Sequence, residues 1–125
     1  MSKHSRDAAE ALQHYKNYAV DATAVLVKGE KCNLFGCVLE NNHATEVVYL
    51  QLFDAVQAAD VTVGTTPPDL AVMIPAGPDG VIWPILDRPI KHFTKGIVAA
   101  VTKTSRTGST APTTAASVNL FYSIQ

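Results

Sequence analysis

The side chains of this chain that could bind a metal ion or form a covalent intermediate include two cysteines and four histidines. Cys32 and Cys37 are separated by four residues, and no CxxC pair accompanies them. In a β-strand this odd spacing places the two sulfurs on opposite faces, which disfavours a disulfide and shared metal ligation. The histidines form no HxH or HxxxH pair and are His4, His14, His43 and His92. The sequence therefore predicts buried, inert thiols, no metal site and no cofactor.

Residue patterns for other kinds of catalysis are missing as well. The chain contains no GxSxG nucleophile elbow, and the segment 63–68 (VGTTPP) has too few glycines for a phosphate-binding loop. Trp83 could stack on a sugar, but a single tryptophan in a small domain usually packs in the core or at an interface. Trp83 is therefore also a candidate interface residue. The sequence thus predicts no enzyme. A glycan-binding module that presents Trp83, Tyr49 or Tyr122 is an alternative from another class.

Composition excludes several classes of partner. The 125 residues correspond to one domain, and their net charge of −1 argues against binding to nucleic acid. No apolar run is long enough to span a membrane, and the N-terminus lacks the apolar stretch of a signal peptide. We therefore expect synthesis in a cytoplasm. Charged residues make up only 17% of the chain, against about 25% in typical proteins, which suits a surface partly buried against other subunits.

Charge of each sign is concentrated in a separate part of the chain. Seven acidic residues and no Lys or Arg lie between Cys32 and Asp87. Five basic residues and no acidic ones lie between Arg88 and Gln125. The two blocks could pair within one subunit, or they could form complementary faces between subunits of a ring. The second alternative makes Lys91 and Lys95 candidate interface residues.

The N-terminal segment differs from the rest of the chain. Residues 1–19 carry mixed charge and no strand pattern, and Asp7 with Glu10 is a weak helix-start signal. A short helix over residues 8–17 is one prediction for this segment. We interpret residues 1–19 as an N-terminal arm, extended or helical once docked, with Leu12 and Tyr15 as its anchoring side chains.

Residues 20–125 read as a succession of short strands. Strand-like apolar runs alternate with turn signals, and no helical segment separates them. Expected strands cover residues 23–27, 34–39, 47–53, 61–63, 70–74, 81–85, 97–102 and 118–124. In the last, Val118, Leu120 and Tyr122 face one way and Asn119 and Phe121 the other. This pattern predicts an all-β, antiparallel β-sandwich, with a jelly roll as the leading topology and an immunoglobulin-like sandwich as the alternative.

Several strings within residues 20–125 resemble small virion structural proteins of tailed phages. The strings are VYLQLFDA at 48–55, VTVGTTPPDL at 61–70 and HFTKGIVAAVTKTSRTGSTAPTTAASVNLFYS at 92–123. The resemblance implies a capsid decoration (cement) or head-knob protein with a jelly-roll-like fold. It defines no catalytic or binding residues, and the segment 79–89 departs from the pattern.

Taken with the composition, the resemblance gives a functional expectation. We expect a non-enzymatic protein of the virion, located on the capsid surface and made in the host cytoplasm. Its expected partners are other copies of itself, as a homotrimer, and the major capsid protein. A component of the tail, the baseplate or a fibre-attachment site is the alternative within the same class.

Overall fold

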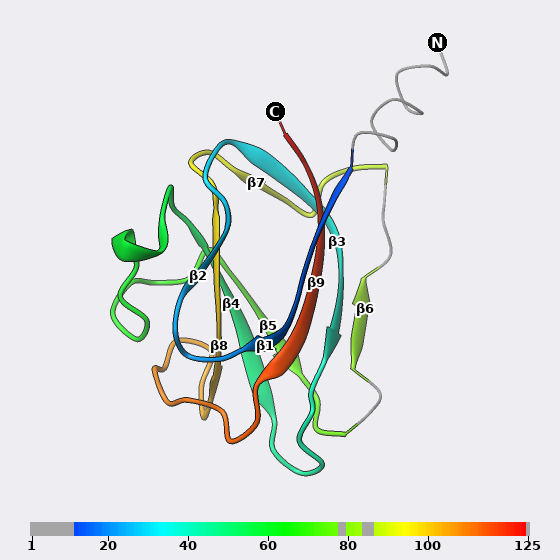
Figure 1. Cartoon of the computed structure of the whole chain (residues 1–125), viewed down its shortest axis with the longest axis vertical. Helices are drawn as coiled ribbons and strands as arrows, with labels where there is room; N and C mark the ends of the chain where they lie inside the picture. The colour runs from blue at the N-terminus through cyan, green and yellow to red at the C-terminus, as the bar shows by residue number, and fades with distance from the viewer. Residues whose placement is uncertain (1–11, 78–79, 84–86, 125) are drawn as a thin grey trace.

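The chain folds as two antiparallel sheets packed face to face (Figure 1). The computed structural model describes residues 12–77, 80–83 and 87–124. The first sheet has the order β1 (Gln13–Val20), β9 (Ala116–Ile124), β3 (Cys32–Glu40) and β6 (Val81–Trp83), and β7 (Lys91–Phe93) also pairs with β3. The second sheet has the order β2 (Val25–Lys28), β8 (Ile97–Lys103), β4 (Val48–Asp54) and β5 (Leu70–Ile74). The predicted antiparallel β-sandwich is confirmed.

The main core lies between the two sheets and follows the alternation of apolar residues. In β9, Val118, Leu120 and Tyr122 are buried in this core, and Asn119 and Phe121 point to the opposite face, as the sequence predicts. In β4 the inward residues are Val48, Leu50 and Leu52, which are all fully buried or nearly so. In β4 and β9 the period-2 pattern is therefore sufficient to predict which face enters the core.

The cysteines correct one expectation, because both lie in the main core. The pairing of β3 with β9 shifts register between Leu34 and Gly36, where Phe35 is the extra residue of a β-bulge. A bulge changes the parity of every position that follows it, so Cys32 and Cys37 share a face despite their odd spacing. Burial raises the pKa of each thiol to about 11, and at Cys32 the charges of Asp54 and Glu30 add to this effect.

Both thiols are expected to be unreactive while the protein is folded. With a pKa of about 11, roughly one thiol in a thousand is ionised at pH 8, and the thiolate is the reactive form. Labelling with a chromogenic disulfide reagent should therefore be slow in the native state and release two equivalents once denaturant is added. Rapid labelling of one thiol before unfolding would show that Cys32 or Cys37 is accessible.

The boundary of the N-terminal arm also needs correction. Residues 1–11 lie outside the described residues, but Gln13–Val20 form β1, which is paired along β9. The helix predicted over residues 8–17 is therefore wrong for residues 13–17. Tyr15 packs against the main core, and the His14 ring stacks on Phe121 with 4.6 Å between ring centroids. Because β9 supplies these contacts from the far end of the chain, local sequence did not reveal the strand.

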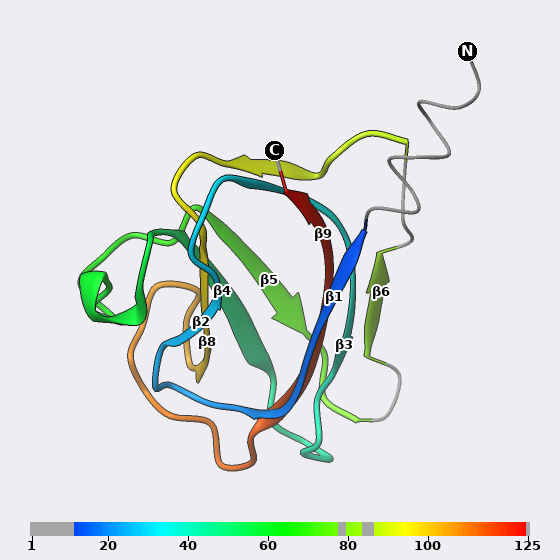
Figure 2. The ribbon, with the colours of Figure 1, turned by 45° about the horizontal axis from the view of Figure 1, so that its top comes forward.

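Two further predictions differ from the structure. Residues 61–63 are a loop rather than a strand, and β7 forms where no strand was predicted. The loop residues Val61 and Val63 pack against a second, smaller core on the outer face of the second sheet, which contains Phe53, Val98 and Ala100. Figure 2 shows the connection between β4 and β5, with its short 3-10 helix η1 (Ala58–Asp60), on the outer side of β8 and β4. The apolar character of residues 61–63 thus serves loop packing.

Candidate functional site

Most of the residues in the strings that carry the resemblance lie on the second sheet or in its connections, and β4 stands between β8 and β5 in that sheet. The end of the third string, residues 116–123, belongs to β9 of the first sheet. Successive residues of β4 alternate between the main core and the outer face, where two long connections cover the sheet. One connection runs from residue 55 to 69 and the other from 104 to 115. We call this assembly of β4, β8 and the two connections the loop-covered face. Its polar side chains are the strongest candidates for function, because they are held in place by many contacts.

Asp54, the last residue of β4, binds the turn between β7 and β8. Its carboxylate accepts hydrogen bonds from the backbone N–H of Thr94 (3.0 Å), Lys95 (2.7 Å) and Gly96 (3.3 Å), and from the Thr94 hydroxyl (2.8 Å). Burial acts to raise the pKa of Asp54, but the hydrogen bonds from Lys95, Thr94 and Gly96 outweigh it and lower the pKa. Asp54 therefore stays ionised and stabilises the turn.

Gly96 lies where three backbone segments converge. A Cβ atom at this position would lie 2.4 Å from the carbonyl oxygen of Lys28 and 2.6 Å from that of Ala55. The N–H of Ala55 in turn donates to the carbonyl oxygen of Gly96. Only glycine allows this approach, which explains why glycine stands in the HFTKGI string between the buried side chains of Phe93 and Ile97.

Gln51 forms a hydrogen bond that links the second connection, residues 104–115, to the sheet. Its side-chain Nε2 donates to the Thr102 hydroxyl (2.7 Å) and to the carbonyl oxygen of Gly108 (3.0 Å), and both Gln51 and Thr102 are fully buried. The Gln51 Oε1 atom is buried and has no hydrogen-bond partner in the structure. The amide thus holds the second connection against β4 and β8 at Gly108.

The two connections also touch each other. A Cβ atom on Gly64 would lie 2.6 Å from Cβ of Ser109, so the VGTTPP turn and the TGSTAP segment pack closely. Gly64 has φ of +93°, a conformation that a side chain would strain. The two threonine-rich strings of the resemblance therefore lie in contact, although 45 positions separate Gly64 from Ser109.

Glu46 links the acidic and basic blocks of the sequence. Its carboxylate accepts hydrogen bonds from the backbone N–H of Thr113 (2.8 Å) and from the Thr113 hydroxyl (2.7 Å), and it pairs with Lys103 at 3.4 Å. The hydrogen bonds from Thr113 and the charge of Lys103 lower the pKa of Glu46. This ion pair joins an acidic side chain of the first block to a basic side chain of the second within one chain.

The candidate interface residues do not gather at one place. Tyr15 lies on β1 at one edge of the first sheet and packs in the core, and Leu12 is half-buried just before this strand. Trp83 and Lys91 lie across β9 and β3 from it, because β6 and β7 both pair with the far side of β3. Trp83 packs against the core, and Lys95 is exposed in the next turn. The five residues therefore form no single contact surface.

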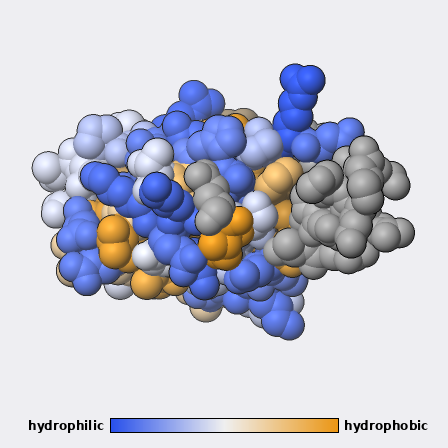
Figure 3. Space-filling model, turned by 90° about the horizontal axis from the view of Figure 1, so that it is seen from above, coloured by the Kyte–Doolittle hydropathy of each residue, from blue (hydrophilic) through white to orange (hydrophobic). Residues whose placement is uncertain are grey.

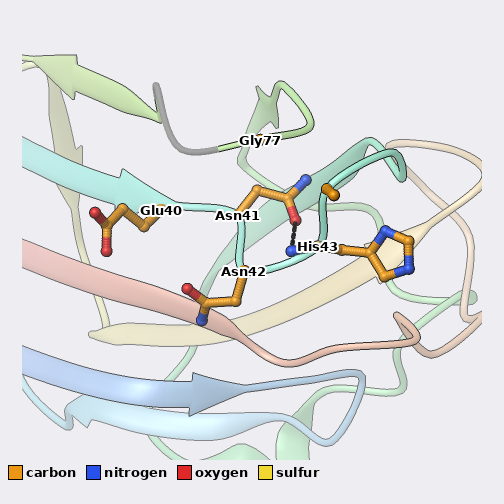
Figure 4. A pocket seen from close by; sticks show the side chains of 6 residues that line it. Glu40, Asn41, Asn42, His43 and Gly77 are labelled. Carbon is orange, nitrogen blue, oxygen red and sulfur yellow. Dashed lines mark hydrogen bonds between the residues drawn. The ribbon is translucent and has the colours of Figure 1, made fainter.

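The surface is hollowed at two described places. The first, of about 310 Å³, lies at the turn between β3 and β4 and is lined by residues including Glu40, Asn42 and His43. Figure 4 shows that the His43 side chain points away from Glu40 and Asn42, and that Asn41 accepts a hydrogen bond from the backbone N–H of His43. His43 Nδ1 accepts two further backbone N–H groups. These polar groups organise the turn and do not converge on a ligand position.

The second hollow, of about 240 Å³, adjoins Asp54 and includes Asp60, Asp69 and Lys95. Asp69 accepts the backbone N–H of Asp54, and Asp60 accepts the amide of Gln57. Within the described residues, no three His, Cys, Asp or Glu side chains are arranged to hold a metal ion. The acidic groups of this hollow are bonded to the chain's own backbone and side chains.

Aromatic side chains do not form an exposed platform for a sugar at the positions expected. Tyr122 is buried, and its hydroxyl donates to Gln13. Trp83 packs on the core from β6, whereas Tyr49 lies on the outer face of the second sheet. Seen from above, the surface is mostly hydrophilic with separate hydrophobic patches (Figure 3). No helix in the part of the chain that the structure describes is long and apolar enough to cross a membrane.

Sequence reasoning did not identify three residues that join the strands to the loops. Asp54, Gln51 and Gly96 all stand within the strings that carry the resemblance, but nothing in their spacing indicated a shared role. A polar residue in an otherwise apolar strand, as Gln51 is in YLQLF, was the available signal. Comparisons with family models, curated proteins and solved structures found no match for this chain.

Proposed function

We propose that this chain is a non-enzymatic structural protein of a phage virion, and that it decorates the capsid surface as a homo-oligomer. Its partners are other copies of itself and the major capsid protein. The resemblance of three strings within residues 20–125 to small virion proteins is the starting point of the proposal. Low charge over a small domain adds support, because such a surface suits contacts between subunits.

The observation that carries the proposal is how the polar groups of the loop-covered face are used. Asp54 and Gln51 of this face, and Glu46 just before β4, form their hydrogen bonds within the chain, with its loops and with β8. Such a network stiffens a body and leaves no obvious reactive group for a substrate. A cement protein needs this property, because it holds capsomers against internal pressure without chemistry of its own.

Virions of the phage that encodes this sequence should contain the protein on the outside of the head. Purified particles can be checked by mass spectrometry, and cryo-electron microscopy would locate the protein. Added protein should co-sediment with particles that lack it. Location on the tail or baseplate would replace the decoration assignment by the alternative in the same class, and absence from virions would exclude both.

Removal of residues 1–11 tests whether the part of the N-terminal arm that precedes β1 contributes to binding. Because β1 begins at Gln13, this cut leaves every described strand in place, and circular dichroism should show an unchanged β signal. If the arm binds a neighbouring subunit, its loss should weaken co-sedimentation by roughly 10²–10⁴-fold, since a tethered second contact multiplies avidity. Full binding by the shortened chain would show that the sandwich alone contacts the capsid.

A further inference from the structure

The free edges of the two sheets differ in their ability to accept another strand. β5 is an edge strand of the second sheet, and its five side chains (LAVMI) are all apolar. Edge strands of monomeric proteins usually carry a charge, a proline or a bulge that prevents pairing with another chain. β5 contains no charge or proline, and its pairing with β4 is regular throughout.

The other edges are protected. β1 carries Lys16 and a register shift between Asn17 and Val20. β2 has four residues, a register shift and Lys28. β6 and β7 have three residues each. Since short, charged or bulged edges resist strand addition, β5 is the best-suited edge in the described structure.

The apolar edge continues onto the outer face of the second sheet. Val72 and Ile74 of β5 point into the core, so Ala71 and Met73 point outward, and Met73 is 44% exposed. Met73 lies opposite Tyr49 of β4, and Val47 just before β4 is 37% exposed. We call Val47, Tyr49, Ala71 and Met73 the edge patch. It contains no charged side chain.

We propose that β5 pairs antiparallel with β5 of a second copy of the chain, about a twofold axis at Val72. In an antiparallel pair, directly opposed residues lie on the same face, and the register centred on Val72 uses all five residues of the strand. Ala71 then lies opposite Met73 of the second copy, a small side chain against a large one, on the outer face. Leu70 lies opposite Ile74 of the second copy on the core face, and the two second sheets form one continuous sheet.

Prolines limit this pairing to the length of β5. Pro67 and Pro68 stand shortly before the strand and Pro75 directly follows it, and a proline cannot donate a hydrogen bond to a strand ladder. A five-residue ladder together with the edge patch buries less surface than a typical stable interface, which buries about 800 Å² per partner. The contact should therefore give a dimer whose population depends on concentration, and chains cannot add beyond the dimer through this edge.

Analytical ultracentrifugation of the full chain over a range of concentrations tests the contact. The wild-type protein should sediment as a monomer–dimer mixture, and Met73→Lys should weaken the association on the order of tenfold or more. The reason is that the lysine would lie beside apolar side chains of the second copy. Ile82→Lys is the matched control, because Ile82 is an apolar residue, 68% exposed, on the other sheet. It should leave the association unchanged.

Cysteine cross-linking tests the register. With the axis at Val72, an Ala71→Cys, Met73→Cys double variant places the new cysteines of the two copies directly opposite each other. Their Cα atoms then lie about 4.5–5.5 Å apart, which is within the range that a disulfide spans. The single Ala71→Cys variant places them about 7–8 Å apart. Mild oxidation should therefore cross-link the double variant efficiently and the single variant poorly.

Three results would overturn the proposal. They are a wild-type chain that stays monomeric at every concentration, an oligomer that is insensitive to Met73→Lys, and a double variant that does not cross-link. A trimer unaffected by the lysine substitution belongs to the second case. None of these measurements involves a capsid, so their failure leaves the proposed virion function to be tested separately.

Discussion

Replacement of Gly96 by alanine is expected to lower the melting temperature by roughly 10 °C or more, which corresponds to about 3 kcal/mol for a domain of this size. The added Cβ would lie 2.4 Å and 2.6 Å from the carbonyl oxygens of Lys28 and Ala55. Both are backbone atoms, so no side-chain rotation can relieve the overlap. The turn before β8 would have to move away from two neighbouring segments, and Asp54 would lose part of its hydrogen-bond network.

Gly77→Ala is the matched control for this experiment. Gly77 has φ of +91°, but a Cβ atom there would come no closer than 4.0 Å to its nearest neighbour, the carbonyl oxygen of Ala44. Its substitution should cost only the conformational strain of the left-handed region, about 1–2 kcal/mol. Thermal unfolding followed by circular dichroism compares the two variants. If Gly96→Ala melts at or above the temperature of Gly77→Ala, the close approach at Gly96 does not constrain the fold.

Replacement of Asp54 by alanine should reduce the free energy of unfolding by about 2–3 kcal/mol at pH 7, because hydrogen bonds to a charged acceptor are among the stronger ones. The variant leaves the N–H groups of Thr94, Lys95 and Gly96 without their acceptor. Asp54→Asn keeps the shape and one acceptor oxygen but removes the charge. Asp54→Asn should therefore lower the free energy of unfolding less than Asp54→Ala does. Denaturant unfolding measures both changes.

The effect of Asp54→Asn on stability is expected to depend on pH. The pKa of Asp54 is lower in the folded state than its ordinary value, so the folded protein favours the ionised form. This contribution is fully present above the unfolded pKa of about 3.9 and is lost as the pH falls through the lower, folded value. The stability difference between wild type and Asp54→Asn should consequently shrink between pH 5 and the acid end of the titration. A difference that stays constant over this range would mean that the Asp54 charge adds nothing to stability.

These two predictions concern one junction, and the junction explains why the HFTKGI and VYLQLFDA strings carry so many constraints. Asp54 needs three N–H groups in a tight turn, and Gly96 lets that turn approach the end of β4. Gln51 then secures the connection over the outer face. A chain that keeps these residues keeps a rigid loop-covered face, and this property is what we relate to a structural role.

Local sequence was sufficient for the parts of the fold whose signals are local. The alternation in β9 and the bounded apolar run of β5 follow from side-chain periodicity, and Leu70–Ile74 forms a strand with the bounds that the sequence predicts. The nearly all-β architecture follows from the same pattern. Composition likewise gave the low charge that motivates the proposed self-association.

Tertiary structure decided the rest, because the responsible partners lie far away along the chain. β1 is a strand because β9 pairs with it, about a hundred positions downstream, and the cysteines share a face because of one bulge in β3. Asp54 acquires its role only when residues 94–96 reach it, forty positions later. Residues 61–63 look like a strand because they are apolar, but they pack as a loop on Phe53 and Val98. A local pattern records which residues prefer burial, whereas the partner that buries them is chosen by the fold.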